Sequence, residues 1–127
     1  MRPKFRAWDK EFKEMVQVDA LVLDAQVIKA TYKNGNVGKE DIKYYDLMQT
    51  TGLLDKNGKE IFEGDIVDYK GRKAIVNWHG SYASFIYRFV DELQERKSEW
   101  KPLYLAYYKF EVVGNVHENK ELLEVEE

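Results

Sequence analysis

Residues 63–78 decide the fold; they read Glu-Gly-Asp-Ile-Val-Asp-Tyr-Lys-Gly-Arg-Lys-Ala-Ile-Val-Asn-Trp. In the first half, Ile66 and Val67 point to opposite faces of an extended segment, as in a strand. Lys70-Gly71-Arg72 is a tight turn, and residues 73–78 form the return strand. Two strands joined by a short glycine turn predict a β-hairpin. Gly-Asp-Ile-Val before a basic turn and a return strand is typical of small SH3-like barrels, so the predicted fold is mainly β with a barrel-type part.

The flanking sequence also predicts strands. Strand candidates lie at residues 4–8, 12–18, 21–23, 27–28, 44–51, 84–90, 103–108 and 110–116. Asn34-Gly35 and Asn57-Gly58 are strong hairpin signals. Residues 91–100 fit a polar loop or one or two helical turns equally well, and residues 121–123 predict a short helical turn. We therefore expect a small barrel around residues 60–80 and the 103–116 strands, additional N-terminal strands and little helix.

The 127-residue length fits one domain, which we place at 1–127, with a division near residue 52 as the alternative. The chain has no Cys and two His, which excludes disulfides and Cys-ligated metal sites. No metal or cofactor is therefore expected. The N-terminus has no apolar segment of the kind a signal peptide needs, and no stretch approaches a membrane span. These observations predict a cytoplasmic protein that makes no membrane contact.

Charge is distributed unevenly along the chain. The formal net charge is -3, and residues 118–127, with five Glu and one Lys, account for -4 of it. The rest of the chain is therefore nearly neutral and has no large basic excess of the kind that marks nucleic-acid binders. The acidic end is expected to be a solvated tail, and the alternatives are binding of a basic partner and mimicry of DNA.

The sharpest basic cluster consists of Lys70, Arg72 and Lys73. At a hairpin tip, beside Tyr69 and Trp78, these side chains could contact phosphates while a ring stacks on a base. The competing interpretation is an ordinary solvated turn, which we favour. Lys70, Arg72 and Lys73 are thus the candidate nucleic-acid contacts.

Acidic and histidine side chains give weaker signals. Glu63 and Asp65 would share one strand face, but a hard-cation site needs more convergent oxygens than two. We expect Asp65 to accept local backbone hydrogen bonds instead, and residues 55–58 to form a hairpin turn and not a ligand cradle. His79 and His117 lack any accompanying nucleophile or metal-ligand spacing. No catalytic residue is therefore assigned, and we expect the protein not to be an enzyme.

Aromatic residues crowd the last third of the chain. Tyr104, Tyr107, Tyr108 and Phe110 lie within seven positions. In β proteins such residues usually fill the core or form cross-strand pairs. Exposed, they would suit a subunit or ligand surface, because Tyr and Trp are enriched at interfaces.

Three blocks of sequence carry a resemblance to a known family. Residues 47–67, LMQTTGLLDKNGKEIFEGDIV, resemble the central signature of the YopX family, small proteins encoded by phages and prophages. KFRAWD at 4–9 and EVVGNVHEN at 111–119, with Leu122-Leu123, resemble its first and last motifs in the same order. The matches depart from the family pattern at Thr50, His117 and Lys120. The resemblance implies a mostly β fold with a barrel-like part, a phage origin and oligomer formation, and it supplies no catalytic residues.

Two functions follow as hypotheses. The first is a phage-encoded, non-enzymatic binding or assembly module whose partner is a phage or host protein or a second copy of the chain. The alternative is a nucleic-acid-binding accessory protein that acts during phage infection or lysogeny. Either would operate in the bacterial cytoplasm. Recovery of a defined protein after nuclease treatment would favour the first, and salt-sensitive binding to DNA or RNA the second.

Overall fold

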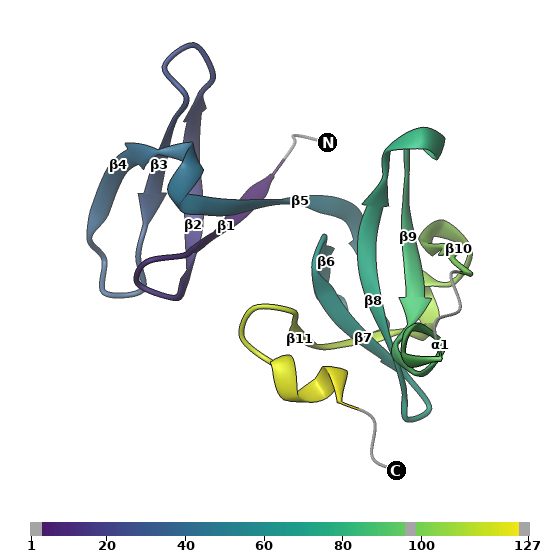
Figure 1. Ribbon diagram of the computed structural model, residues 1–127. Helices are drawn as coiled ribbons and strands as arrows, with labels where there is room; N and C mark the ends of the chain where they lie inside the picture. Colours follow the sequence, from purple (N-terminus) through teal and green to yellow (C-terminus); the bar gives the residue numbers. More distant parts are fainter. Residues whose placement is uncertain (1–3, 96–98, 125–127) are drawn as a thin grey trace. The chain divides into compact units, whose positions relative to one another are not determined.

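A computed structural model describes residues 4–95 and 99–124. The prediction of a mainly β fold with little helix is confirmed, because the described residues form two antiparallel sheets and one short α-helix (Figure 1). The strands are β1 (Phe5–Asp9), β2 (Glu14–Val22), β3 (Val27–Thr31), β4 (Val37–Asp41), β5 (Tyr45–Leu54), β6 (Glu60–Phe62), β7 (Asp65–Tyr69), β8 (Arg72–His79), β9 (Ser84–Phe89), β10 (Lys101–Pro102) and β11 (Glu111–Asn115). The helical elements are α1 (Val90–Gln94) and the 3-10 turns η1 (Ile42–Tyr44), η2 (Gly80–Tyr82), η3 (Leu103–Leu105), η4 (Tyr107–Lys109) and η5 (Lys120–Leu123).

The chain divides into two compact units, residues 1–50 and 51–127, and β5 contributes to both. The six-stranded sheet has the order β4-β3-β2-β1-β5-β6. Side chains from one face of β1, β2, β3 and the start of β5 form the core of the first unit, because alternate strand residues share a face. That core consists of Ala7, Val16, Ile28, Ala30 and Tyr45.

The second unit is built on the five-stranded sheet, in the order β10-β9-β8-β7-β11. The predicted hairpin is confirmed: Tyr69 of β7 pairs with Arg72 of β8 across a two-residue loop. Lys70 and Gly71 both have positive φ, at 53° and 84°, which is the pattern of a type I′ turn. The core against this sheet consists of Ile61, Val67, Ala74, Val76, Tyr87, Phe89, Leu103, Ala106 and Phe110.

Two parts of the expected architecture are wrong in detail. The predicted strand at 103–108 folds as η3 and η4 instead. Leu103 and Ala106 are both buried, three residues apart, and the N–H of Ala106 donates to the Leu103 carbonyl at 2.9 Å. Side chains three apart share a face in a 3-10 turn but not in a strand. With that segment turned and β10 two residues long, the described strands form open sheets and not a closed barrel.

The remaining local predictions concern the polar segment and the C-terminal end. Residues 90–94 form α1, which selects the helical alternative for the start of the 91–100 segment. Residues 96–98 of that segment lie outside the described residues. The helical turn predicted at 121–123 is confirmed as η5.

Candidate functional site

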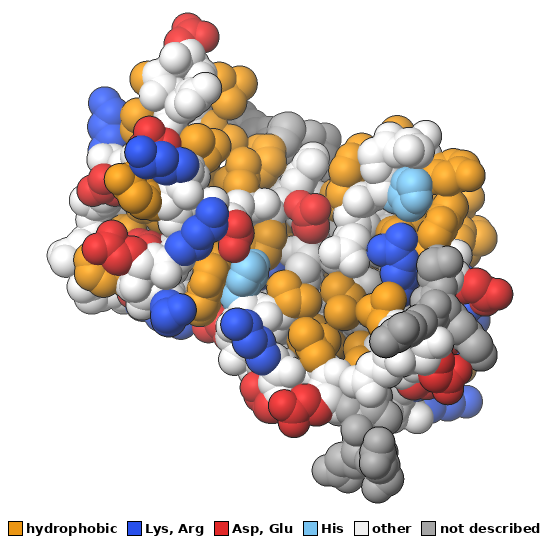
Figure 2. All heavy atoms as spheres, in the orientation of Figure 1, with side chains coloured by type: hydrophobic (Ala, Val, Ile, Leu, Met, Phe, Trp, Pro, Cys, Tyr) orange, Lys and Arg blue, Asp and Glu red, His pale blue; other side chains and the backbone are white. Residues whose placement is uncertain are grey.

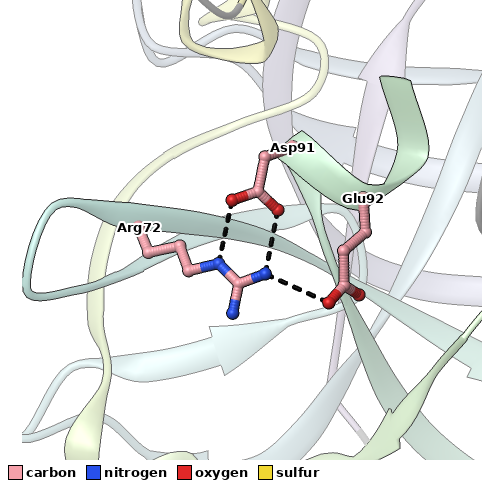
Figure 3. A network of polar contacts seen from close by, with 3 residues as sticks. All are labelled: Arg72, Asp91 and Glu92. Atoms are coloured by element: carbon pink, nitrogen blue, oxygen red, sulfur yellow. Dashed lines mark hydrogen bonds and ion pairs between the residues drawn. The ribbon is translucent and has the colours of Figure 1, made fainter. Parts of the chain in front are cut away.

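The basic turn lies at the β7–β8 hairpin tip, but its central cation is already paired. The Arg72 guanidinium donates to both carboxylate oxygens of Asp91, at 2.9 and 3.0 Å, and to Glu92 Oε1 at 3.1 Å (Figure 3). Its carbon also lies 3.6 Å from the centre of the Phe89 ring. The hydrogen bond to Asp91 is the main reason that the pKa of Arg72 is raised. Arg72 therefore links α1 to the hairpin, and two carboxylates of α1 balance its positive charge.

An open cleft of about 620 Å³ adjoins this tip. Three segments line it: the hairpin tip, the start of α1 and the C-terminal turn η5. Its lining residues are Lys70, Gly71, Arg72, Lys73, Val90, Asp91, Glu121, Leu122 and Glu124. Three cations thus face three carboxylates. The structure brings all three predicted contact residues together, but in a cleft that is close to neutral.

The carboxylates of the central motif bind backbone. Asp55 is 6% exposed, and its Oδ1 accepts hydrogen bonds from the N–H groups of Asn57 and Lys59, both at 2.8 Å. Its Oδ2 accepts from the N–H of Val112 in β11 at 2.9 Å. Burial alone would raise the pKa of Asp55, but these three donors outweigh it and lower the pKa. Asp55 closes the predicted turn and also ties it to β11.

Asp65 confirms the expected local role. Its Oδ2 accepts a hydrogen bond from the N–H of Phe62 at 2.7 Å. Gly64, with φ of 86°, donates to the Val76 carbonyl and accepts from the N–H of Val116. This turn therefore connects β8 with the segment after β11. Among the described residues, no group of three or more His, Cys, Asp or Glu side chains could hold a metal ion.

The last motif forms a tight cap after β11. Asn115 Oδ1 accepts from the N–H groups of His117 and Glu118, and its amide donates to Glu118 Oε1. The N–H of Asn115 donates to Asn119 Oδ1 at 3.1 Å. A Cβ at Gly114 would lie 2.5 Å from that oxygen, so the motif needs glycine there. These motif residues thus hold turns through backbone hydrogen bonds. The candidate functional surface lies outside them.

Such a surface lies at the far end of the β8–β9 hairpin, at η2. His79, Tyr82 and Trp100 pack against one another in edge-on or tilted arrangements, with ring centres 4.8 to 5.0 Å apart. Trp78, the residue before His79 in β8, packs edge-on against Phe85 with ring centres 5.0 Å apart. Trp78 and Tyr82 are nevertheless 45% and 65% exposed. Hydrophobic side chains are visible around this end of the hairpin (Figure 2).

The two 3-10 turns after β10 add further exposed rings. Tyr104 and Tyr108 are 60% and 57% exposed, whereas Tyr107 packs against the core. Tyr107 and Phe110 therefore pack in the core, as expected, whereas Tyr104 and Tyr108 are exposed and leave the expectation of a subunit surface open. Sequence reasoning identified the aromatic segment but missed Tyr82 and Trp100, because their stacking depends on pairing across β8, β9 and β10. The sequence signal that could have located Tyr82 is the group of aromatic residues around the turn at 79–84, namely Trp78, Tyr82 and Phe85.

A second cleft, about 700 Å³, lies in the first unit and was not foreseen. Three of its lining residues are hydrogen-bonded: the Tyr32 hydroxyl donates to Asp9 Oδ2 at 2.6 Å and lies 2.7 Å from the Tyr45 hydroxyl. Burial, with the Asp9 hydrogen bond second, raises the pKa of Tyr32, and burial also raises that of Tyr45. Asp9 Oδ1 accepts from the N–H groups of Glu11 and Phe12. The network therefore holds the β1–β2 turn in place, which is a structural role.

None of the helices in the described part of the chain is long and apolar enough to cross a membrane. A search of curated proteins gives no match to the chain. Among solved structures, it is similar to protein EF1440 from Enterococcus faecalis, known from a crystal structure, at 32% sequence identity and a TM-score of 0.62. That match covers 98% of this chain and 99% of the other. A family model described as YopX protein matches residues 4–124, nearly the whole chain and all three motif blocks. The chain therefore belongs to the YopX family.

Proposed function

We propose that the chain is a phage-encoded, non-enzymatic binding or assembly module that acts in the bacterial cytoplasm. The observation that carries this proposal is the exposure of four aromatic side chains on the second unit, those of Trp78, Tyr82, Tyr104 and Tyr108. Interface cores are enriched in Tyr and Trp, which bury large areas at low cost in side-chain entropy. The phage context rests on the family resemblance.

The polar groups support the same proposal. Two acidic side chains of the central motif, Asp55 and Asp65, accept backbone hydrogen bonds and hold turns. An acid or base at work in catalysis would instead face a cleft with room for a substrate. The exposed aromatic side chains of the second unit thus support a binding function better than the acidic side chains support catalysis.

The nucleic-acid alternative has less support from the geometry. Phosphate binding gains its strength from several cations that release counterions together. Arg72 is paired with Asp91 and Glu92, so Lys70 and Lys73 are left to carry that attraction beside two further carboxylates. We therefore place protein binding first.

The test is a tagged pull-down from phage-infected cells with the native chain, Trp78→Ser/Tyr82→Ser and a matched control. The control, Phe12→Ser/Tyr44→Ser, removes two exposed rings from the first unit. We expect one defined protein to be recovered by the native chain and the control, to survive nuclease, and to be lost with the test variant. Equal recovery by all three forms, or recovery that collapses with nuclease, would contradict the proposal. Sedimentation of the purified native chain shows whether a second copy is the partner.

A further inference from the structure

The C-terminal turn η5 and the basic hairpin tip line one cleft. Glu121, Leu122 and Glu124 line the same cleft as Lys70 and Lys73. The Gln94 side-chain amide, at the end of α1, donates to the Leu123 carbonyl at 2.9 Å. Two glutamates of the acidic C-terminal segment, Glu121 and Glu124, thus line the same cleft as the sharpest basic cluster.

The charges around the cleft form two sets, and Arg72 belongs to the set that is joined by ion pairs. Arg72 is paired with Asp91 and Glu92, on α1. That leaves Lys70 and Lys73 to face Glu121 and Glu124. Val90 and Leu122 add apolar lining. The cleft therefore complements a segment in which acidic residues flank a leucine, and this chemistry belongs to a peptide and not to a phosphate backbone.

The packing of η5 is shallow. No residue of η5 is buried, and Leu122 and Leu123 are only partly covered. Short elements with little buried apolar area open locally at low free-energy cost. A segment tethered to its own site competes at an effective concentration in the millimolar range, which a partner of moderate affinity can overcome.

We infer that η5 is an intramolecular acidic ligand of this cleft, displaced when an acidic, leucine-containing segment of a partner protein binds there. This surface is separate from the aromatic end of the β8–β9 hairpin and adds a second contact to the proposed function. Its residues differ from those of the pull-down, so either proposal can fail alone.

The experiment measures binding of a fluorescent peptide with the sequence of residues 118–127 to the full-length chain. The variant Glu121→Gln/Glu124→Gln weakens the internal competitor at two exposed positions. We expect it to bind the peptide roughly tenfold more tightly than the native chain, because the tethered segment no longer competes well. The gain is expected to disappear when Lys70→Asn/Lys73→Thr is added. A peptide with glutamine at the two corresponding positions is expected to bind weakly.

The matched control is Glu11→Gln/Asp24→Asn, which removes two exposed negative charges from the first unit. An equal gain with this control would show a general charge effect and overturn the inference. So would a gain that survives the loss of both lysines, or no binding to any form at millimolar peptide. A parallel titration uses duplex DNA at low salt. If DNA binding increases in the glutamine variant and peptide binding does not, the cleft is a phosphate site and the inference is wrong.

Discussion

Single residues of the motifs hold the backbone of this protein, and Asp55 shows it most clearly. Its carboxylate accepts three backbone hydrogen bonds, two within its own turn and one from Val112 in β11. Asp55→Asn replaces one carboxylate oxygen with an N–H₂ group, so one backbone donor faces another donor. We expect this change to lower the free energy of unfolding by about 2 kcal/mol at neutral pH, because a buried donor loses its partner. Urea denaturation measures it, with Asp24→Asn as the exposed control.

The Asp55 carboxylate also gives the stability a defined pH dependence. Its folded pKa is lowered, so its contribution is fully present above the unfolded value of about 3.9 and is lost as the pH falls through the folded pKa. The difference in stability between the native chain and Asp55→Asn is therefore expected to shrink below about pH 4. A difference that stays constant from neutral pH to pH 3 would show that the carboxylate charge contributes nothing.

Gly114 makes a second prediction at this scale. An added Cβ would lie 2.5 to 2.9 Å from three atoms of the Asn119 side chain, including its Cβ. Gly114→Ala is expected to cost about 1–3 kcal/mol, the range for overpacking, and to break the hydrogen bond from the Asn115 N–H. Asn119→Gly removes the obstructing atoms, so the double variant should cost less than the sum of the two single ones. Additive costs in a thermal-unfolding cycle would refute the contact.

At the scale of elements, the β7–β8 turn tests how far local conformation alone determines stability. Gly71 has φ of 84° and nothing within 4 Å of an added Cβ. Gly71→Ala should therefore cost about 1 kcal/mol through the backbone alone. Lys70→Asn should be neutral or slightly stabilising, since Asn-Gly suits a type I′ turn. Denaturation midpoints check both, and a stable Gly71→Ala variant would argue against the turn type.

Elements that neighbouring residues determine could be predicted from the sequence, whereas long-range contacts could not. Hairpins marked by local turn chemistry, such as Lys70-Gly71 and Asn34-Gly35, form as expected, because four or five adjacent residues decide them. The 103–108 segment was misjudged, since its aromatic content favours a strand while the burial of Leu103 and Ala106 favours 3-10 turns. The pairing of Arg72 with Asp91 spans 19 positions, and no local pattern signals it. The basic cluster was therefore located correctly, but its neutralisation was not foreseen.

At the scale of the whole molecule, the two units have separate hydrophobic cores. One contains Ile28 and lies within residues 7–45, and the other contains Val76 and lies within residues 61–110. Deleting buried methyl groups destabilises the core that contains them, by about 2–4 kcal/mol for Ile→Ala. We expect Ile28→Ala to raise amide exchange in β2 and β3 while β8 and β9 keep their protection, and Val76→Ala to do the reverse.

Hydrogen exchange with mass spectrometry shows whether the two units open independently or together. If each unit opens on its own, peptides from the unaltered unit exchange at the native rate, as cooperative subunits of a fold do. The aromatic end and the acidic cleft both belong to the second unit, so Ile28→Ala should also leave recovery of the partner in the pull-down unchanged. Equal loss of protection in both units would mean that the chain unfolds as one cooperative body. Function could then not be assigned to the second unit alone, because every destabilising change in either core would reach the binding surfaces.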